Sequence, residues 1–211
     1  MKSCVLFDFD GVIINSEPVI KAAFTLSFRD IVGRGEPPVR EYLSHMGDSF
    51  DRIMSKMSLP TQMYPVFRDY STRLSNLIEV FPGISELLRE LRSEGVATGL
   101  VTGKDRRRVD ELIEVLGLPG FDAIVGGDEI ENPKPHPQPL LRALDMLGVQ
   151  AEQAWMIGDS PNDIVAARSA GVSSCAVTWG IGSRRELEDV KPDVLVSSPA
   201  ELRSLLLKAA A

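Results

Sequence analysis

The chain alternates short apolar runs with stretches of helical periodicity, and this alternation limits its possible folds more than any other feature. The runs that we interpret as buried strands are residues 4–7, 96–101, 121–125, 154–157, 174–178 and 193–196. Between them, apolar residues recur at helical spacing, as at Ile84, Leu87, Leu88 and Leu91. Strands that alternate with helices build βαβ units. The sequence therefore predicts an α/β fold, a Rossmann-like and mainly parallel sheet with helices on both faces.

One long segment, residues 16–79, interrupts this alternation. It contains no convincing strand, it has helical spacing such as that of Ile20 and Phe24, and its prolines divide it into roughly four short helices. Because it directly follows the loop after the first strand, we expect an inserted α-helical cap above the carboxyl end of that strand. The predicted domains are a catalytic core of residues 1–15 and 80–211 and a cap domain of residues 16–79.

The charge of the chain excludes several classes of partner. Lys and Arg number 23 against 30 Asp and Glu, so the net charge of −7 disfavours binding to nucleic acid and to membranes. Asp8 and Asp10 interrupt the first apolar run, so we do not expect the N-terminus to be a signal peptide. No apolar run approaches the length of about 18 residues that a membrane span needs. Cys4 and Cys175 lie in apolar runs, which is typical of reduced cysteines. We expect a cytoplasmic protein, and with no exposed heptad pattern we expect a monomer.

Polar side chains that could carry chemistry follow the predicted strands. They are Asp8, Asp10, Thr102, Lys134, Asp159 and Asp163. Because ligands of parallel sheets bind beyond the carboxyl ends of the strands, we expect these groups to converge there. Clustered carboxylates repel one another unless a hard cation lies among them, and Mg²⁺ suits carboxylates, waters and a substrate phosphate. Together with a hydroxyl and a lysine, this set predicts phosphoryl transfer.

Four motifs then carry a family resemblance. DFDGVIINSE at 8–17, VTGK at 101–104, PKPHP at 133–137 and GDSPND at 158–163 resemble, in order, the motifs of the haloacid dehalogenase-like hydrolases. The helical segment is similar to the cap of the phosphoglycolate phosphatase and β-phosphoglucomutase branch. The resemblance implies a phosphatase whose cap closes over the site.

The resemblance also assigns roles to individual residues. It implies that Asp8 is the nucleophile that forms an aspartyl-phosphate, and that Asp10 first protonates the leaving oxygen and then activates water. Thr102 and Lys134 would bind the phosphoryl group, and the motif residues Gly103 and Lys104 are further candidates for binding substrate.

The same resemblance implies a magnesium site. Its predicted ligands are Asp8, the main-chain carbonyl of Asp10, and Asp159, with Asp163 close behind. An alternative interpretation of Asp163 is that it only caps the helix that begins near Pro161.

The substrate specificity is expected to depend on residues of the cap. His45, Gly47 and Ser49 lie in a polar break between predicted cap helices, where this branch places its specificity loop; the alternative is a plain interhelical turn. Residues 32–42, VGRGEPPVREY, are similar to the cap of phosphatases associated with 3-amino-5-hydroxybenzoate biosynthesis, which implies a sugar phosphate. Arg106–Arg108 could face a second anion or form a solvated helix surface.

The predicted function is a Mg²⁺-dependent phosphatase for a small phosphomonoester. A phosphomutase of the β-phosphoglucomutase type would use the same Asp8 and Asp10 and stays open as an alternative. A phospho-accepting signalling module is a distant alternative, because its phosphorylated Asp follows the third strand and it lacks a cap. A binding protein without catalytic activity is also distant.

Overall fold

The computed structural model describes residues 3–46, 48 and 50–208. Within these residues, six strands form one parallel sheet in the order β5-β4-β1-β6-β7-β8. The strands are β1 (Cys4–Phe7), β4 (Ala97–Val101), β5 (Ala123–Val125), β6 (Ala154–Gly158), β7 (Ser173–Val177) and β8 (Val194–Val196). Each lies within two residues of a predicted apolar run, so the predicted Rossmann-like sheet is confirmed.

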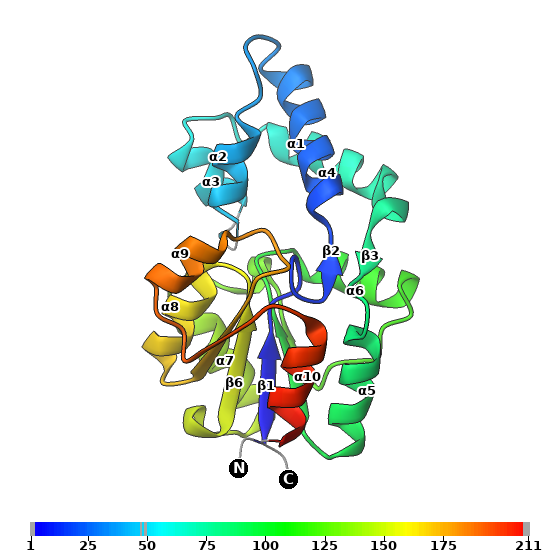
Figure 1. Cartoon of the computed structure of the whole chain (residues 1–211). Helices are drawn as coiled ribbons and strands as arrows, with labels where there is room; N and C mark the ends of the chain where they lie inside the picture. The colour runs from blue at the N-terminus through cyan, green and yellow to red at the C-terminus, as the bar shows by residue number, and fades with distance from the viewer. Residues whose placement is uncertain (1–2, 47, 49, 209–211) are drawn as a thin grey trace.

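Helices cover both faces of this sheet (Figure 1). One apolar layer packs α5 (Ile84–Ser93), α6 (Arg106–Val115) and α10 (Pro199–Lys208) against the strands. The opposite layer packs α7 (Gln138–Leu147) and α8 (Pro161–Ala170). The short helix α9 (Arg184–Asp189) contributes Leu187 to a small cluster with Ile164 of α8. Since both faces are covered, the strands are buried, which explains their almost uninterrupted apolar sequences.

The helical insert comprises α1 (Glu17–Ile31), α2 (Val39–Ser44), α3 (Phe50–Lys56) and α4 (Met63–Arg73). These four α-helices, counted over the described part of residues 16–79, agree with the predicted number. The insert has an apolar cluster of its own, with Ile20, Phe24, Phe28, Tyr42, Ile53, Met54 and Met63 buried. Figure 1 shows these helices beyond the carboxyl end of β1, where the sequence placed a cap.

A short ribbon that the sequence did not reveal connects the insert to the sheet. β2 (Ile14–Asn15) and β3 (Glu79–Val80) pair antiparallel, with Ile14 opposite Val80. A 3₁₀ turn (Ser75–Leu77) precedes β3. Strands of two residues contain no apolar alternation, which is why periodicity did not indicate them. β2 ends just before the predicted boundary at 16, and β3 spans the boundary between 79 and 80. The division into two domains stays a prediction.

β1 occupies the position in the sheet that matters most for a ligand. Strands that follow it in sequence lie on both of its sides, β4 on one and β6 on the other. In parallel sheets such a point of reversal leaves a crevice beyond the carboxyl ends. Asp8 immediately follows β1 and therefore lies at this crevice. Among the described residues, none of the helices is long and apolar enough to cross a lipid bilayer.

Candidate active site

Lys134 is the most completely buried cation of the described site. Its side chain is 2% exposed, and Nζ donates hydrogen bonds to Asp8 Oδ1 at 3.0 Å, to Asp163 Oδ1 at 2.6 Å and to the carbonyl of Val101 at 3.0 Å. Burial alone would lower the pKa of Lys134, but Asp163 and Asp8 raise it above its ordinary value. The lysine is therefore charged and holds two strand ends together.

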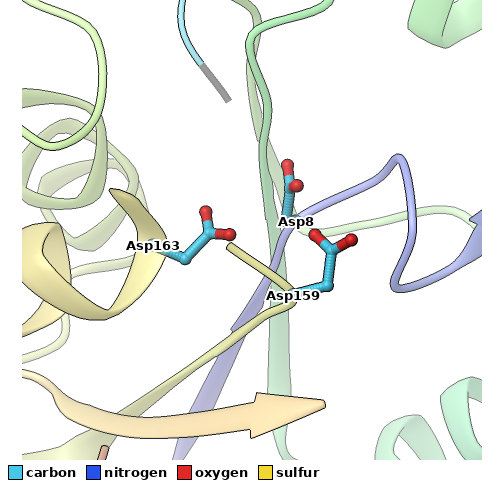
Figure 2. Close-up of side chains that lie close together, drawn as sticks. All are labelled: Asp8, Asp159 and Asp163. Carbon is cyan, nitrogen blue, oxygen red and sulfur yellow. The ribbon is translucent and has the colours of Figure 1, made fainter. Parts of the chain in front are cut away.

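Three buried carboxylates surround this lysine. Asp8, Asp159 and Asp163 each offer an oxygen within 4.8 Å of the others, and Figure 2 shows the three side chains converging from separate segments. Burial is the main cause that raises the pKa of Asp8 to about 7 and the pKa of Asp159 well above its ordinary value, and the neighbouring carboxylates raise both further. Oxygen ligands at this spacing fit a hard divalent cation, which would favour the ionised carboxylates.

Asp163 has a second structural task. Ser160 begins helix α8, and its N–H and Oγ donate to Asp163 Oδ2 at 3.1 and 2.6 Å. Asp163 is thus the third residue of a capping box and not the cap itself. Its other oxygen binds Lys134, so it links the start of α8 to the lysine. A direct contact with a metal stays a prediction.

The Asp10 carboxylate points to different partners. Its Oδ1 accepts a hydrogen bond from Ser16 Oγ at 2.5 Å and pairs with Lys104 Nζ at 3.2 Å. Its side chain is not part of the acidic group of Asp8, Asp159 and Asp163. The roles expected of Asp10, its main-chain carbonyl as a metal ligand and its carboxylate in proton transfer, stay predictions.

Thr102 lies at the end of β4, beside these groups. Its Oγ1 accepts the backbone N–H of Lys104 at 3.1 Å, which leaves the hydroxyl proton available to a ligand. Thr102 is 5% exposed, and Thr102, Gly103 and Lys104 all line the same cavity as Asp8. The structure therefore brings the predicted sheet-domain residues together at one edge.

A cavity of about 1060 Å³ lies between the sheet and the insert. The insert contributes aromatic, aliphatic and polar residues to its wall, among them Tyr42, Met46, Asp48, Phe50, Tyr64 and Phe67. His45 is half-buried at the end of α2 and does not line the cavity. Gly47 and Ser49 lie outside the described residues. The aromatic lining was missed from the sequence because the rings are dispersed over three helices; their common membership of the insert was the available signal.

The insert also contacts the sheet domain directly. Tyr64 donates a hydrogen bond to Asp105 at the start of α6, and Arg108 donates to the carbonyl of Ser71 at 3.2 Å. Arg106 and Arg107 pair along the helix surface with Asp110 and Glu111. Of the three consecutive arginines, the first two thus form a solvated helix surface, whereas Arg108 is 13% exposed in its side chain and lines the cavity.

Comparison with known proteins decides the family. Residues 5–177 match the family model described as haloacid dehalogenase-like hydrolase. The chain belongs to this family. It is 33% identical over 206 residues to a pyrophosphatase named PpaX from Bacillus cereus (strain G9842), an alignment that covers 96% of the chain and 95% of that relative.

Solved structures of the family share the fold. CbbY from Rhodobacter sphaeroides, crystallised with phosphate, is 26% identical with a TM-score of 0.82 and covers 96% of each chain. A hydrolase from Pseudomonas syringae is 22% identical with a TM-score of 0.86, covering 99% of this chain and 100% of its own. The predicted family, fold and enzyme class are confirmed. The chain is a haloacid dehalogenase-like phosphatase.

Proposed function

We propose that this phosphatase is Mg²⁺-dependent and hydrolyses a small phosphomonoester through a covalent aspartyl-phosphate on Asp8. The observation that carries the proposal is the position of Asp8, held by Lys134 at 3.0 Å and grouped with two further carboxylates at the floor of a large cavity. This arrangement combines a fixed nucleophile, a permanent positive charge and oxygen ligands for a cation.

In the first half-reaction, the Asp8 oxygen that Lys134 does not hold attacks phosphorus opposite the ester oxygen. A bond forms between Asp8 and phosphorus, and the bond from phosphorus to the leaving oxygen breaks. Asp10 gives its proton to that oxygen, and the alcohol departs. In the second half-reaction, a water attacks the same phosphorus while Asp10 takes its proton. Inorganic phosphate leaves and Asp8 is restored.

The remaining residues of the floor stabilise charge. The Thr102 hydroxyl and the amides around Gly103 are proposed to bind phosphoryl oxygens, and Lys134 to offset the negative charge that accumulates. Asp8, Asp159 and the main-chain carbonyl of Asp10 are the proposed Mg²⁺ ligands, with Asp163 close behind. When bound, Mg²⁺ would neutralise carboxylate and phosphoryl charge.

The insert is proposed to act as the cap domain, with residues 16–79 closing over a core of residues 1–15 and 80–211. In the described residues the backbone passes between the two through the ribbon of β2 and β3 and its flanking turns, which supports hinge motion of the insert as a unit. Closure would exclude water from the site. We also propose that the chain acts as a monomer. Cys4 and Cys175 are free and buried, which supports a reducing compartment such as the cytoplasm.

Metal-dependent release of phosphate tests this proposal. We expect the purified chain to release inorganic phosphate from a panel of sugar and acid phosphates with Mg²⁺, to lose activity in EDTA, and to recover it on adding Mg²⁺. Analysis of the same reactions for isomerised sugar phosphate tests the phosphomutase alternative. Isomer formed faster than phosphate would favour the mutase.

Hydrolysis of pyrophosphate is a second candidate. It is favoured by the identity of 33% to a relative named as a pyrophosphatase. The same assay, run with pyrophosphate and with a phosphomonoester at equal concentrations, separates the two. A kcat/KM for pyrophosphate far above that for every ester would make the anhydride the substrate.

A further inference from the structure

The three tyrosines of the chain differ in the hydrogen bonding of their hydroxyl groups. Tyr64 donates to Asp105, and Tyr70 donates to Asp30 at 2.8 Å. The hydroxyl of Tyr42 has no hydrogen-bond partner among the residues that the structure describes. Tyr42 is nevertheless the most buried of the three, at 3% exposed. A hydroxyl on so buried a residue, without a protein partner, is unfavourable unless a ligand or water satisfies it.

Packing fixes the direction of the Tyr42 ring. The ring stacks on Phe24 with centroids 4.2 Å apart and an interplanar angle of 18°. Phe50 and Phe67 lie around it at centroid distances of 6.2 and 6.0 Å. A side chain enclosed by three aromatic rings loses little further freedom when it binds a ligand, so the hydroxyl is pre-organised.

Tyr42 lines the cavity of the proposed reaction centre. Tyr42 and Asp10 line the same cavity, and the hydroxyl oxygen is not among the fully enclosed polar atoms. Burial raises the pKa of Tyr42, and the charge of Asp10 raises it further. The phenol therefore stays protonated and can act as a hydrogen-bond donor.

We propose that the Tyr42 hydroxyl is a specificity group, which donates a hydrogen bond to an oxygen of the leaving group. It would thereby favour phosphomonoesters of polyhydroxylated alcohols over phosphomonoesters of plain alkyl alcohols. The inference rests on the proposed function, because Asp10 is the group expected to protonate that same leaving group. A polar group of the enzyme that is satisfied only by the correct substrate discriminates against analogues that lack the matching oxygen.

Matched substrates test this directly. Glycerol 3-phosphate is compared with propyl phosphate, and glucose 6-phosphate with cyclohexylmethyl phosphate, so that each pair differs in its hydroxyl oxygens. We expect Tyr42→Phe to lower kcat/KM by roughly 3- to 10-fold for the hydroxylated member of at least one pair and to leave the alkyl member unchanged, since one neutral hydrogen bond is lost. Tyr70→Phe is the control, because its hydroxyl binds Asp30 away from the cavity. It should leave both ratios unchanged.

Binding provides a second readout that does not depend on turnover. Calorimetric titration of glycerol 3-phosphate and glucose 6-phosphate into Asp8→Asn and into Asp8→Asn/Tyr42→Phe should show weaker binding to the double variant. If the wild type hydrolyses the esters and Tyr42→Phe changes both members of each pair equally, or neither, the role of Tyr42 is wrong while the proposed function stands. If the esters bind through Tyr42 but are not hydrolysed, the proposed function is wrong and the binding role stands. Absence of both binding and hydrolysis would contradict both.

Discussion

The backbone N–H of Ile181 donates a hydrogen bond to Asp159 Oδ2 at 2.6 Å. The Ile181 side chain packs against the apolar cluster of the insert, so one residue contacts both a proposed metal ligand and the proposed cap. The glycine before it allows this close approach. A Cβ at Gly180 would lie 2.2 Å from Asp159 Oδ2 and 2.5 Å from the carbonyl oxygen of Gly11.

The first prediction concerns this loop. Gly180→Ala should weaken Mg²⁺ binding by roughly 10- to 100-fold, because the new methyl group displaces the Asp159 carboxylate from its position. Isothermal calorimetry with Mg²⁺ measures the affinity. Gly120→Ala is the matched control, since a Cβ there would meet no atom within 4 Å. Equal Mg²⁺ affinity of the two variants would show that the loop does not position Asp159.

The second prediction concerns the stability that Lys134 provides. Lys134→Met leaves Asp8 and Asp163 as buried carboxylates without their cation, and the free energy of unfolding should fall by about 3–5 kcal/mol. Lys21→Met removes a solvent-accessible pair with Glu17 and should cost less than about 1 kcal/mol. Urea denaturation with EDTA present measures both. A similar loss in the two variants would mean that the buried network contributes no more than a surface pair.

The third prediction is a dependence of the Mg²⁺ effect on pH. The pKa of Asp8 is about 7 in the folded chain because burial raises it, against about 3.9 for an exposed Asp. The folded state therefore binds more protons than the unfolded state across this window, so without metal the free energy of unfolding falls as pH rises from about 4 to about 7.

Mg²⁺ favours the ionised carboxylates and should offset that loss. Its addition should raise the melting temperature more at about pH 8 than at about pH 5.5, where protons compete with the metal. Asp8→Asn should weaken this pH dependence, because the amide does not titrate. A larger Mg²⁺ effect at the lower pH would have the opposite sign and would contradict the assignment of these carboxylates as ligands.

The fourth prediction separates substrate choice from phosphoryl chemistry. Phe50 belongs to the insert wall and Thr102 to the sheet floor of the cavity. Phe50→Ala should change the order of preference among esters, while Thr102→Val should lower turnover of every ester by a similar factor of roughly 100, as expected for loss of one donor to the phosphoryl group. Steady-state kinetics over one ester panel measures both. The reverse assignment of effects would contradict the proposed division between insert and sheet.

Most of the sheet and of its polar edge follows from the sequence. Val5 and Leu6 pack on opposite sides of β1, and the charged residues follow as soon as such a strand ends. Gly95 and Gly117, which follow two predicted helices, have φ of 71° and 60°, in the left-handed region typical of helix ends. Local rules therefore locate the strand ends, and parallel topology brings them together.

Contacts between residues that lie far apart in the sequence could not be predicted in the same way. Lys134 binds Asp163 through a loop geometry that no local pattern encodes. The polar break was expected to place His45 at the substrate, yet His45 lies outside the cavity lining and Tyr42, one turn earlier, faces it. Which face of a short helix points inward depends on packing among Phe24, Phe50 and the other rings of the insert, and this packing is tertiary.

The most direct test of the account is detection of the phosphoryl group on Asp8. Acid quenching during turnover of a good ester, followed by mass spectrometry of the proteolytic peptides, should find one phosphoryl adduct on the peptide that contains Asp8. Hydroxylamine should remove the adduct, and Asp8→Asn should lack both adduct and turnover. A phosphoryl adduct on another residue, or an Asp8→Asn variant that turns over as fast as the wild type, would contradict the central claim.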